Sequence, residues 1–433
     1  MSQSRSPLSP LLMGERYTSA AFMEAEWENV WTTSWLITVR AEDMPAPGDY
    51  FVEDIGRESI LIVRQDDGTI KAFYNVCQHR GNKLMIESEG SLPAFTCPYH
   101  SWRFELDGTC SYAQDPEDFA GGNPCSRASL VEVSCDVFAG FVWVNMDPQC
   151  ASLREFLGEI FDEWQAYPLE HMNRVQATSV HMPCNWKLLL DNFHETYHVP
   201  TAHPEGIEYA EDSYRETRIE LFKNGHALGQ TKCCIPSRRL PAHKPLMTEP
   251  IAAELQRWDL DPDDFRGREY ETRQAVQQQK RKLGVERGFI HYEKLSDDQL
   301  TDTFHYTVFP NFATSLNPDG MLFLRALPDA KDPEKCIFDC WYYSFGADNS
   351  FDSLLTLEGA TGVERVEREF VNYGEKSLGV VLDGDAWVMV GQQKAMHSRG
   401  YRGAILANQE RRVAQYHDMI DRYIAGYRPD RGN

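Results

Sequence analysis

The chain has 433 residues, of which 42% are hydrophobic and 12% aromatic, and its formal net charge is −23. This length and composition predict a globular protein of two or three domains with a substantial core. The charge argues against nucleic acids and anionic membranes as partners, no apolar run reaches membrane-spanning length and no secretory signal is evident, so we expect a cytoplasmic protein.

The first third of the chain predicts one helix followed by a small β-domain. Residues 17–35 have a partly amphipathic helical pattern. Residues 59–64 (SILIVR) and 140–146 (GFVWVNM) are rich in β-branched and aromatic side chains, which is typical of short buried strands. We therefore expect an all-β domain of about a hundred residues in this region.

Two cysteine–histidine pairs lie between these strands. Cys77 and His79 form a C-x-H half-site, and Cys97 and His100 form a C-x-x-H half-site. Each lies in a segment with turn-forming residues, so two tight loops are expected. Two thiolates and two imidazoles suit a two-iron cluster of Rieske type. Zinc is the main alternative, but zinc-finger spacing groups the cysteines together and the histidines together.

The other cysteines bear on the redox state. Eleven cysteines less these two leave nine, at positions 110, 125, 135, 150, 184, 233, 234, 336 and 340. An odd number in a chain without an evident leader predicts reduced thiols.

A second informative segment is NWKLLLDNFHETYHVPTAHP, residues 185–204. Helical spacing predicts Asp191, Glu195 and His198 on one face. Pro200 is expected to end the helix, so that His203 folds back beside His198. Two histidines and one carboxylate with open positions describe a non-haem Fe(II) site that activates dioxygen, and the carboxylate can come from elsewhere in the chain.

The same segment allows an interpretation of another class. Residues 194–198 match H-E-x-x-H, in which both histidines bind zinc and the glutamate is the general base of a metalloprotease. A protease leaves the upstream cluster without a purpose, and His203 is too close to serve as the distant third ligand. The zinc protease is therefore the minor alternative.

The remainder of the chain predicts strands and then helices. Strand-like runs occupy 304–312, 321–327 and 336–345, and a helix is expected at 408–427. Residues 235–285 are a polar insertion, expected to form a lid or a subunit contact. Strands followed by packed helices make an α+β domain.

Taken together, the two segments resemble the α subunits of the Rieske non-haem iron oxygenases, the aromatic ring-hydroxylating oxygenases. The matching residues are the C-x-H and C-x-x-H loops and the string N-W-K-x-x-x-D-N-x-x-E-x-Y-H-x-x-x-x-H. The resemblance covers nearly the whole chain. It implies an all-β Rieske [2Fe-2S] domain at 46–150 and a helix-grip (START-like) catalytic domain with an antiparallel sheet at 151–433. Residues 1–45 would form an N-terminal helix packing on the catalytic domain.

The resemblance also implies the site residues. The [2Fe-2S] cluster would be bound by Cys77, His79, Cys97 and His100. The stretch 382–406 resembles the family's C-terminal pattern and supplies the third ligand of the mononuclear Fe(II), which gives His198, His203 and Asp385, with Asp383 as the alternative. Glu195 takes the position of the bridging carboxylate in electron transfer, and Asn192 belongs to the catalytic set. Many members have Asp where Glu195 stands and Glu where Asp191 stands, so the subfamily stays open.

The implied function is that of a terminal oxygenase, which uses O₂ and electrons from NAD(P)H to hydroxylate an aromatic or other hydrophobic cyclic compound. The alternative is a monooxygenase or demethylase of a quaternary ammonium compound. No Rossmann glycine signature follows a strand, so a ferredoxin or flavin reductase must deliver the electrons. Arg80, Lys83 and Arg103 are candidates for a basic patch that receives this donor. By resemblance, a head-to-tail homotrimer, with or without a β subunit, places His100 of one chain opposite Glu195 of the next.

Overall fold

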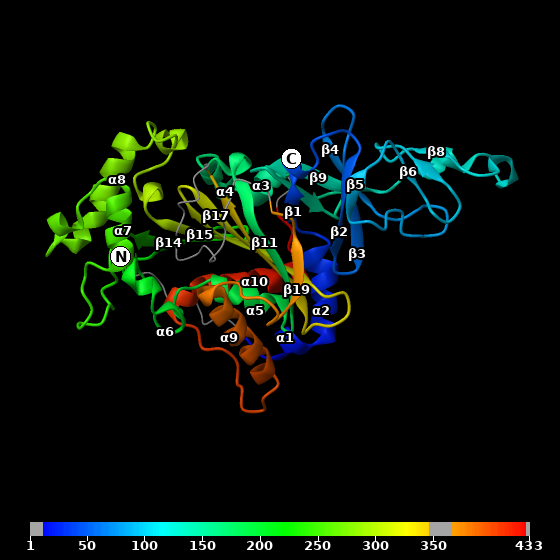
Figure 1. Ribbon diagram of the computed structural model, residues 1–433. Helices are drawn as coiled ribbons and strands as arrows, with labels where there is room; N and C mark the ends of the chain where they lie inside the picture. Colours follow the sequence, from blue (N-terminus) through cyan, green and yellow to red (C-terminus); the bar gives the residue numbers. More distant parts are fainter. Residues whose placement is uncertain (1–11, 346–365, 430–433) are drawn as a thin grey trace. The chain divides into compact units, whose positions relative to one another are not determined.

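The computed structural model describes residues 12–345 and 366–429 (Figure 1). The chain divides into two compact units. The small unit comprises Ala25–Phe156, with residues 329–331 and the segment from Gly426 onward, and contains both cysteine–histidine pairs. The large unit comprises the residues up to Glu24, Leu157–Pro328 and Asp332–Ala425, and contains the predicted iron ligands. The domain boundaries at residues 45 and 150 stay predictions.

The small unit is built from antiparallel strands. Its main sheet has the order β1-β10-β9-β4-β3-β2-β5, and a second sheet has the order β6-β7-β8. The strands are β1 (Leu36–Arg40), β2 (Asp49–Ile55), β3 (Glu58–Arg64), β4 (Ile70–Tyr74), β5 (Glu89–Ser91), β6 (Phe95–Thr96), β7 (Arg103–Phe104), β8 (Cys110–Tyr112), β9 (Glu132–Phe138) and β10 (Phe141–Asn145). The predicted strands at 59–64 and 140–146 correspond to β3 and β10.

The core of the small unit continues up to the metal-binding loops. Leu61, Val63 and Phe73 of β3 and β4 pack with Phe95 and Phe104 of the second sheet, and the same cluster includes Cys77, Cys97 and Trp102. Both cysteines are 2% exposed. A cluster bound at these thiols would therefore be shielded from water on its cysteine side.

The large unit contains a nine-stranded sheet. Its order is β12-β14-β15-β16-β17-β18-β11-β19, with β13 paired to β14. The strands are β11 (Asn173–Met182), β12 (Ala210–Glu211), β13 (Arg218–Leu221), β14 (Ala227–Cys233), β15 (Thr303–Val308), β16 (Phe312–Asn317), β17 (Gly320–Pro328), β18 (Cys336–Ser344) and β19 (Glu369–Asn372). All pairs are antiparallel except β11 with β19, which agrees with the predicted α+β class.

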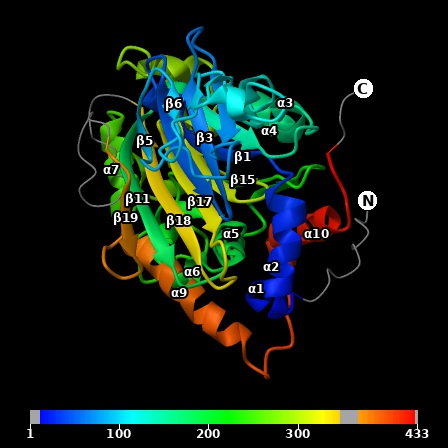
Figure 2. The ribbon, with the colours of Figure 1, turned by 90° about the vertical axis from the view of Figure 1, so that its right-hand side faces the viewer.

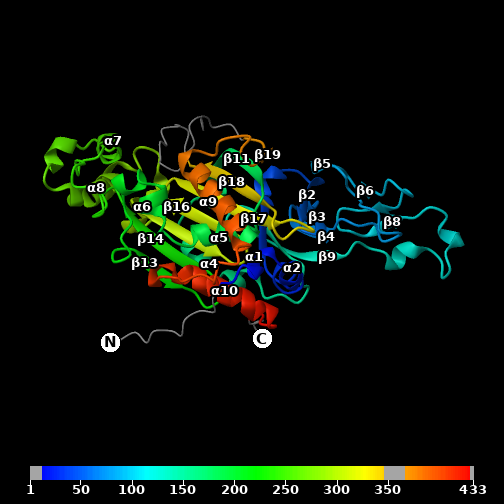
Figure 3. The ribbon, with the colours of Figure 1, turned by 90° about the horizontal axis from the view of Figure 1, so that it is seen from below.

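Three helices cover one face of this sheet, as Figure 3 shows from below. They are α5 (Trp186–Phe193), α9 (Val380–Met396) and α10 (Arg411–Ile424). Phe193 of α5 stacks on Phe338 of β18, with ring centroids 6.0 Å apart. Because side chains alternate along a strand, Tyr306 of β15 points to the other face, where Trp164 of α4 (Glu159–Trp164) packs at 5.8 Å. Figure 2 shows α5 and α9 against β18 from the side.

Several predicted elements have different bounds. The helix expected at 17–35 is broken into α1 (Glu15–Thr18), α2 (Ala20–Glu26) and a π-helical turn at Trp27–Trp31. The run 304–312 is not one strand, because Pro310 has no N–H for the ladder and β15 ends before it. The insertion at 235–285 folds into α7 (Glu249–Arg257) and α8 (Thr272–Leu283).

The expectation of nine reduced thiols is wrong for one pair. Cys110 and Cys125 form a disulfide across the segment that follows β8. The other seven cysteines outside the half-sites, all of them among the described residues, are not in disulfides. Among the described residues, no helix is long and apolar enough to cross a membrane.

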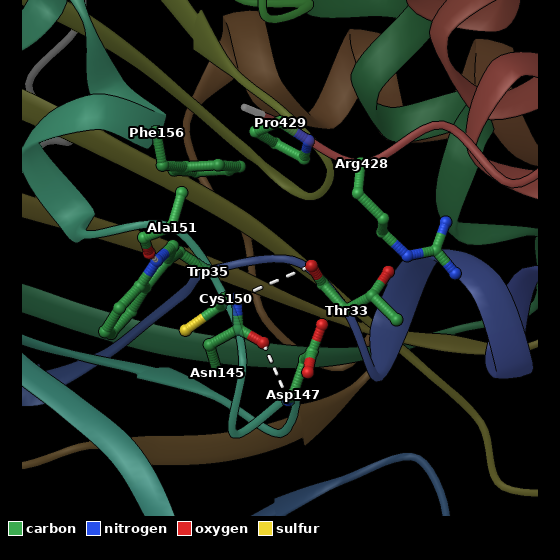
Figure 4. A pocket seen from close by; sticks show the side chains of 9 residues that line it. All are labelled: Thr33, Trp35, Asn145, Asp147, Cys150, Ala151, Phe156, Arg428 and Pro429. Carbon is green, nitrogen blue, oxygen red and sulfur yellow. Dashed lines mark hydrogen bonds between the residues drawn. The ribbon is translucent and has the colours of Figure 1, made fainter. Parts of the chain in front are cut away.

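The small unit also contains a small pocket (Figure 4). Trp35, Phe156 and Pro429 contribute apolar walls, and Asp147 and Arg428 contribute charges. Its lining includes none of the predicted metal ligands. We therefore assign it no part in the site described below.

Candidate metal centres

Three predicted ligands converge in the large unit. Ligand atoms of His198, His203 and Asp385 lie within 4.8 Å of one another. Oδ1 of Asp385 is 2.8 Å from Nε2 of His203 and 3.5 Å from Nε2 of His198. Both imidazoles thus direct the same nitrogen to one point. Two histidines and one carboxylate in this arrangement fit a facial triad for Fe(II).

The chain around these histidines explains how they meet. Asn185 caps α5 by accepting a hydrogen bond from the N–H of Lys187, and α5 ends at Phe193. The chain then turns and forms the short helix α6 (Val199–Ala202), which has Pro200 in its first turn. Pro200 therefore starts a helix where the sequence suggested an end, and His203 follows α6 directly. This turn brings the His203 ring within 5.1 Å of the His198 ring.

Glu195 holds the ring of His198. Nδ1 of His198 donates a hydrogen bond of 2.6 Å to Oε1 of Glu195, so its Nε2 carries the lone pair that faces Asp385 and His203. Oε2 of Glu195 accepts from the backbone N–H of Tyr197 and from that of His198 at 3.1 Å. Burial alone would lower the pKa of His198, but the hydrogen bond and charge of Glu195 outweigh it and raise that pKa.

The two candidate aspartates have different contacts. Asp385 is 2% exposed and belongs to the ligand group. Asp383 instead accepts from the hydroxyl of Ser377 at 2.5 Å and from the N–H of Leu378 at 2.8 Å, at the start of α9. The geometry therefore favours Asp385 as the third ligand, whereas Asp383 ties the first turn of α9 to the residues just before it.

The predicted common face of Asp191, Glu195 and His198 is wrong, because α5 ends before Glu195. Asp191 points away from the ligand group. It accepts from the hydroxyl of Tyr17 at 2.7 Å and from Nε2 of His417 at 2.9 Å.

Two further residues of the segment contribute to its interior. Asn192 has a buried side-chain amide nitrogen with no hydrogen-bond partner among the described residues. His194 is 3% exposed, packs on Tyr416 and is not part of the ligand group. Because residues 194–198 are not helical, the metalloprotease interpretation of H-E-x-x-H does not fit the structure.

The two cysteine–histidine loops of the small unit have the same backbone design. In one loop the N–H of Gly81 donates to the carbonyl of Cys77, and in the other the N–H of Ser101 donates to the carbonyl of Cys97, both at 3.0 Å. The residue four places after each cysteine has positive φ, +73° for Gly81 and +58° for Ser101. The matching turns direct both half-sites to one place.

The histidines of the two loops lie side by side, as expected if both loops bind one cluster. The rings of His79 and His100 lie 4.5 Å apart, and Trp102 stacks on His79 at 4.8 Å. Nδ1 of His79 is buried and has no partner among the described residues, which leaves it available to a metal. Burial raises the pKa of the Cys77 thiol to about 11, so cluster binding there must displace a proton.

The predicted basic patch is mostly neutralised. Lys83 pairs with Asp54 at 3.1 Å, and Arg103 pairs with Glu105 at 3.3 Å. Arg80 lies over the ring of Tyr99, 5.2 Å from its centroid. Of the three cations, only Arg80 has no carboxylate within ion-pair distance in the described parts of the chain.

Comparison with known proteins agrees with this geometry. Residues 34–121 match the Rieske [2Fe-2S] domain, and residues 169–426 match the ring hydroxylating alpha subunit (catalytic domain). The chain is 37% identical over 190 residues to the carnitine monooxygenase oxygenase subunit of Escherichia coli (strain K12), which is 43% of this chain and 50% of that protein. It is 34% identical over 191 residues to the glycine betaine monooxygenase oxygenase subunit of Chromohalobacter salexigens, 44% of this chain and 42% of that protein. The chain thus spans about half the length of the curated relatives it matches.

Solved structures share the fold. The quaternary ammonium Rieske monooxygenase CntA in complex with an inhibitor superposes with a TM-score of 0.67 at 20% identity, over 96% of each chain. A mutant of naphthalene 1,2-dioxygenase bound to phenanthrene gives a TM-score of 0.68 at 19% identity, over 97% of this chain and 93% of that one.

Proposed function

Since the chain belongs to the family of ring hydroxylating alpha subunits, we propose that it is a terminal oxygenase that hydroxylates a small organic substrate. The observation that carries this proposal is the convergence of His198, His203 and Asp385 on one point. A ferrous ion at this point, supplied with electrons by the [2Fe-2S] cluster, would activate O₂. The overall balance is substrate, O₂, two electrons and two protons, giving hydroxylated substrate and water.

The residues of the chain have separate tasks in this proposal. His198, His203 and Asp385 hold the iron and leave positions for O₂. Cys77, His79, Cys97 and His100 hold the cluster. Glu195 fixes the tautomer of His198, and its side chain keeps 12% exposure. That exposure supports a second hydrogen bond to His100 of another copy of this chain, as in a head-to-tail ring, which we propose as the route of electron transfer.

The donor of the electrons is a separate protein in this proposal. A ferredoxin or flavin reductase would pass electrons from NAD(P)H to the cluster. Arg80 and Tyr99 are exposed beside His100, and they support docking of that donor at the loops. We also propose that the chain forms the head-to-tail trimer that the resemblance implies.

Two substrate classes are supported by different observations. A hydrophobic ring is supported by the apolar side chains of Phe193, Leu324 and Phe338 on the face of the sheet that α5 covers. A quaternary ammonium compound is supported by the names of the relatives, which are monooxygenases of carnitine and glycine betaine. Trp387 of α9 is 72% exposed and supports neither class.

The test of the proposal is the variant Glu195→Gln. We expect iron and acid-labile sulfide to stay bound, since Glu195 is not a ligand. Transfer of electrons from the reduced cluster to the iron in single turnover should be about a hundredfold slower, the upper end of the range for loss of a ligand's hydrogen-bond partner. The matched control is Glu208→Gln, because Glu208 lies only a few residues after the iron ligand His203 but pairs with Lys244. A normal single-turnover rate in Glu195→Gln would refute the route, and a chain that binds zinc without sulfide would refute the function.

A further inference from the structure

An unpaired cation lies buried under the helices of the large unit. Arg412 of α10 is 2% exposed. One guanidinium nitrogen donates to the carbonyl of His305 at 3.0 Å, while Nε is buried without a partner among the described residues. Within that part of the chain no carboxylate lies at ion-pair distance from it. The charge of Glu195 acts on Arg412 from beyond ion-pair distance. A buried charge without a direct ion-pair partner is costly, so its retention favours an anion bound from outside the chain.

The sheet makes room for this guanidinium. A Cβ added to Gly229 of β14 would lie 2.9 Å from Cζ of Arg412, so a side chain at this position would collide with the cation. Gly229 is the register partner of His305, and His305 is the register partner of Ser315. Directly opposed residues share a face, so these three positions face α10.

Two histidines with free nitrogens lie beside the cation. Neither ring nitrogen of His194 has a hydrogen-bond partner in residues 12–345 and 366–429, and Nδ1 is buried. The ring of His194 lies 4.5 Å from Tyr416, which is one helical turn after Arg412 and on the same side of α10. His305 is half-buried and uses Nδ1 in a hydrogen bond of 2.7 Å with the hydroxyl of Ser315, which leaves Nε2 free.

Both histidines are neutral at physiological pH. Burial, followed by the charge of Arg412, lowers the pKa of each to about 3. The carboxylates of the neighbouring elements have other partners: Asp191 binds Tyr17 and His417, and Glu195 binds His198. Arg412 is therefore the single charge among the three donor side chains, and Glu195 offsets part of it, which favours a monovalent anion over a doubly charged phosphate.

We propose that Arg412, His194 and His305 form a subsite for a monovalent oxyanion of the substrate, a carboxylate or a sulfonate. This inference rests on the proposed oxygenase function, because His194 lies four residues before the iron ligand His198 on the same segment. Arg412 supplies the charge, and each neutral imidazole supplies one N–H donor. The substrate is then an organic acid, in either of the two classes considered above.

The test uses small anions and the metal-loaded full chain, so that it does not depend on turnover. Thermal unfolding is followed by circular dichroism in 100 mM sodium acetate, sodium methanesulfonate or sodium chloride. We expect acetate or methanesulfonate to raise Tm of the wild type by about 1–3 °C relative to chloride. The two anions distinguish a carboxylate site from a sulfonate site.

Variants then locate the effect. Arg412→Gln should abolish the rise, and Arg412→Lys should keep part of it, because the charge remains. The matched control is Arg411→Gln, since Arg411 lies on the same helix but donates to the carbonyls of Asn408 and Ile219. This control should respond to the anions like the wild type. Without added anion, Arg412→Gln should be at least as stable as the wild type, because a buried charge without a direct ion-pair partner is removed.

The outcomes separate this inference from the proposed function. If neither acetate nor methanesulfonate raises the Tm of the wild type above its value in chloride, the inference is overturned, and these nitrogens bind only water. An equal rise in Arg412→Gln would also overturn it, whether or not oxygenase activity is found. The substrate class is tested by comparing the binding of an acid and its alcohol in two pairs, glycine betaine with choline and benzoate with benzyl alcohol. The acid of at least one pair should bind about 10- to 100-fold more tightly than its alcohol, and Arg412→Gln should remove that preference.

Discussion

The two aspartates at the start of α9 allow a sharp test of the iron site, because they are two residues apart and have separate contacts. Asp385 shares its Oδ1 with Nε2 of both histidines. Asp383 binds Ser377 and the N–H of Leu378. We expect Asp385→Ala to remove the mononuclear iron and Asp383→Ala to leave it in place.

The magnitudes follow from these contacts. Loss of an anionic ligand should weaken iron binding by at least the 10- to 100-fold that is typical for loss of a ligand's supporting partner. Loss of the Asp383 contacts removes hydrogen bonds that join Ser377 and Leu378 to the first turn of α9, which costs about 0.5–1.5 kcal/mol. For a unit of this size, each kcal/mol of lost stability lowers Tm by about 2–4 °C.

The assay is an iron and sulfide count on purified protein after dialysis, with unfolding measured on the same samples. A chain with both centres should contain about three iron atoms, two of them in the cluster. Asp385→Ala should retain about two with unchanged sulfide, and Asp383→Ala should retain all three with a lower Tm. The reasoning is refuted if Asp383→Ala loses the third iron or if Asp385→Ala keeps it.

Three further predictions concern stability and the electron donor. Tyr17→Phe should lower the free energy of unfolding at pH 7 by about 1.5–3 kcal/mol, because it removes a hydrogen-bond donor to the carboxylate of Asp191. The control Tyr401→Phe loses a hydrogen bond to a neutral carbonyl and should cost only about 1 kcal/mol. Burial alone would raise the pKa of Asp191, but His417 and Tyr17 outweigh it and lower that pKa. Its stabilising contribution is therefore complete above pH ~4 and lost below it, so the deficit of Tyr17→Phe should shrink as the pH of the unfolding measurement falls through that range. Because Lys83 and Arg103 are paired with carboxylates, the rate of electron transfer from a protein donor should fall only weakly between about 50 and about 200 mM salt. Arg80→Glu should lower that rate at all salt concentrations. A steep fall with salt that persists in Arg80→Glu would contradict this prediction.

Local patterns in the sequence were enough to find the strands and the metal ligands. The β-branched run at 59–64 predicted β3, because buried strands need such side chains on a pleated surface. The half-sites and the histidines of 198–203 were recognised because their ligand types are rare in this spacing. Asp385 was found only through the resemblance, since an acid in the first turns of a helix is more often a charge complement.

Contacts between distant parts of the chain were not predictable from these patterns. Asp191 was expected beside Glu195, yet its partners Tyr17 and His417 are 174 and 226 residues away. No local signal marks such a pairing. Likewise, Gly81 was recognisable as a turn former, whereas Ser101 adopts the same positive φ with no glycine to announce it.

The early end of α5 connects these observations. If the helix continued through residue 198, Glu195 would extend along its surface, and the Nδ1 contact that fixes the ring of His198 would compete with regular backbone bonding. By ending at Phe193, the helix frees the N–H groups of Tyr197 and His198, and both donate to Glu195. The same end leaves Asp191 as the last acid of the helix, tied to α1 and α10. Asp191 thus anchors α5, while Glu195 orients the iron ligand His198. Arg412 on α10 lies beside both imidazoles of the proposed subsite.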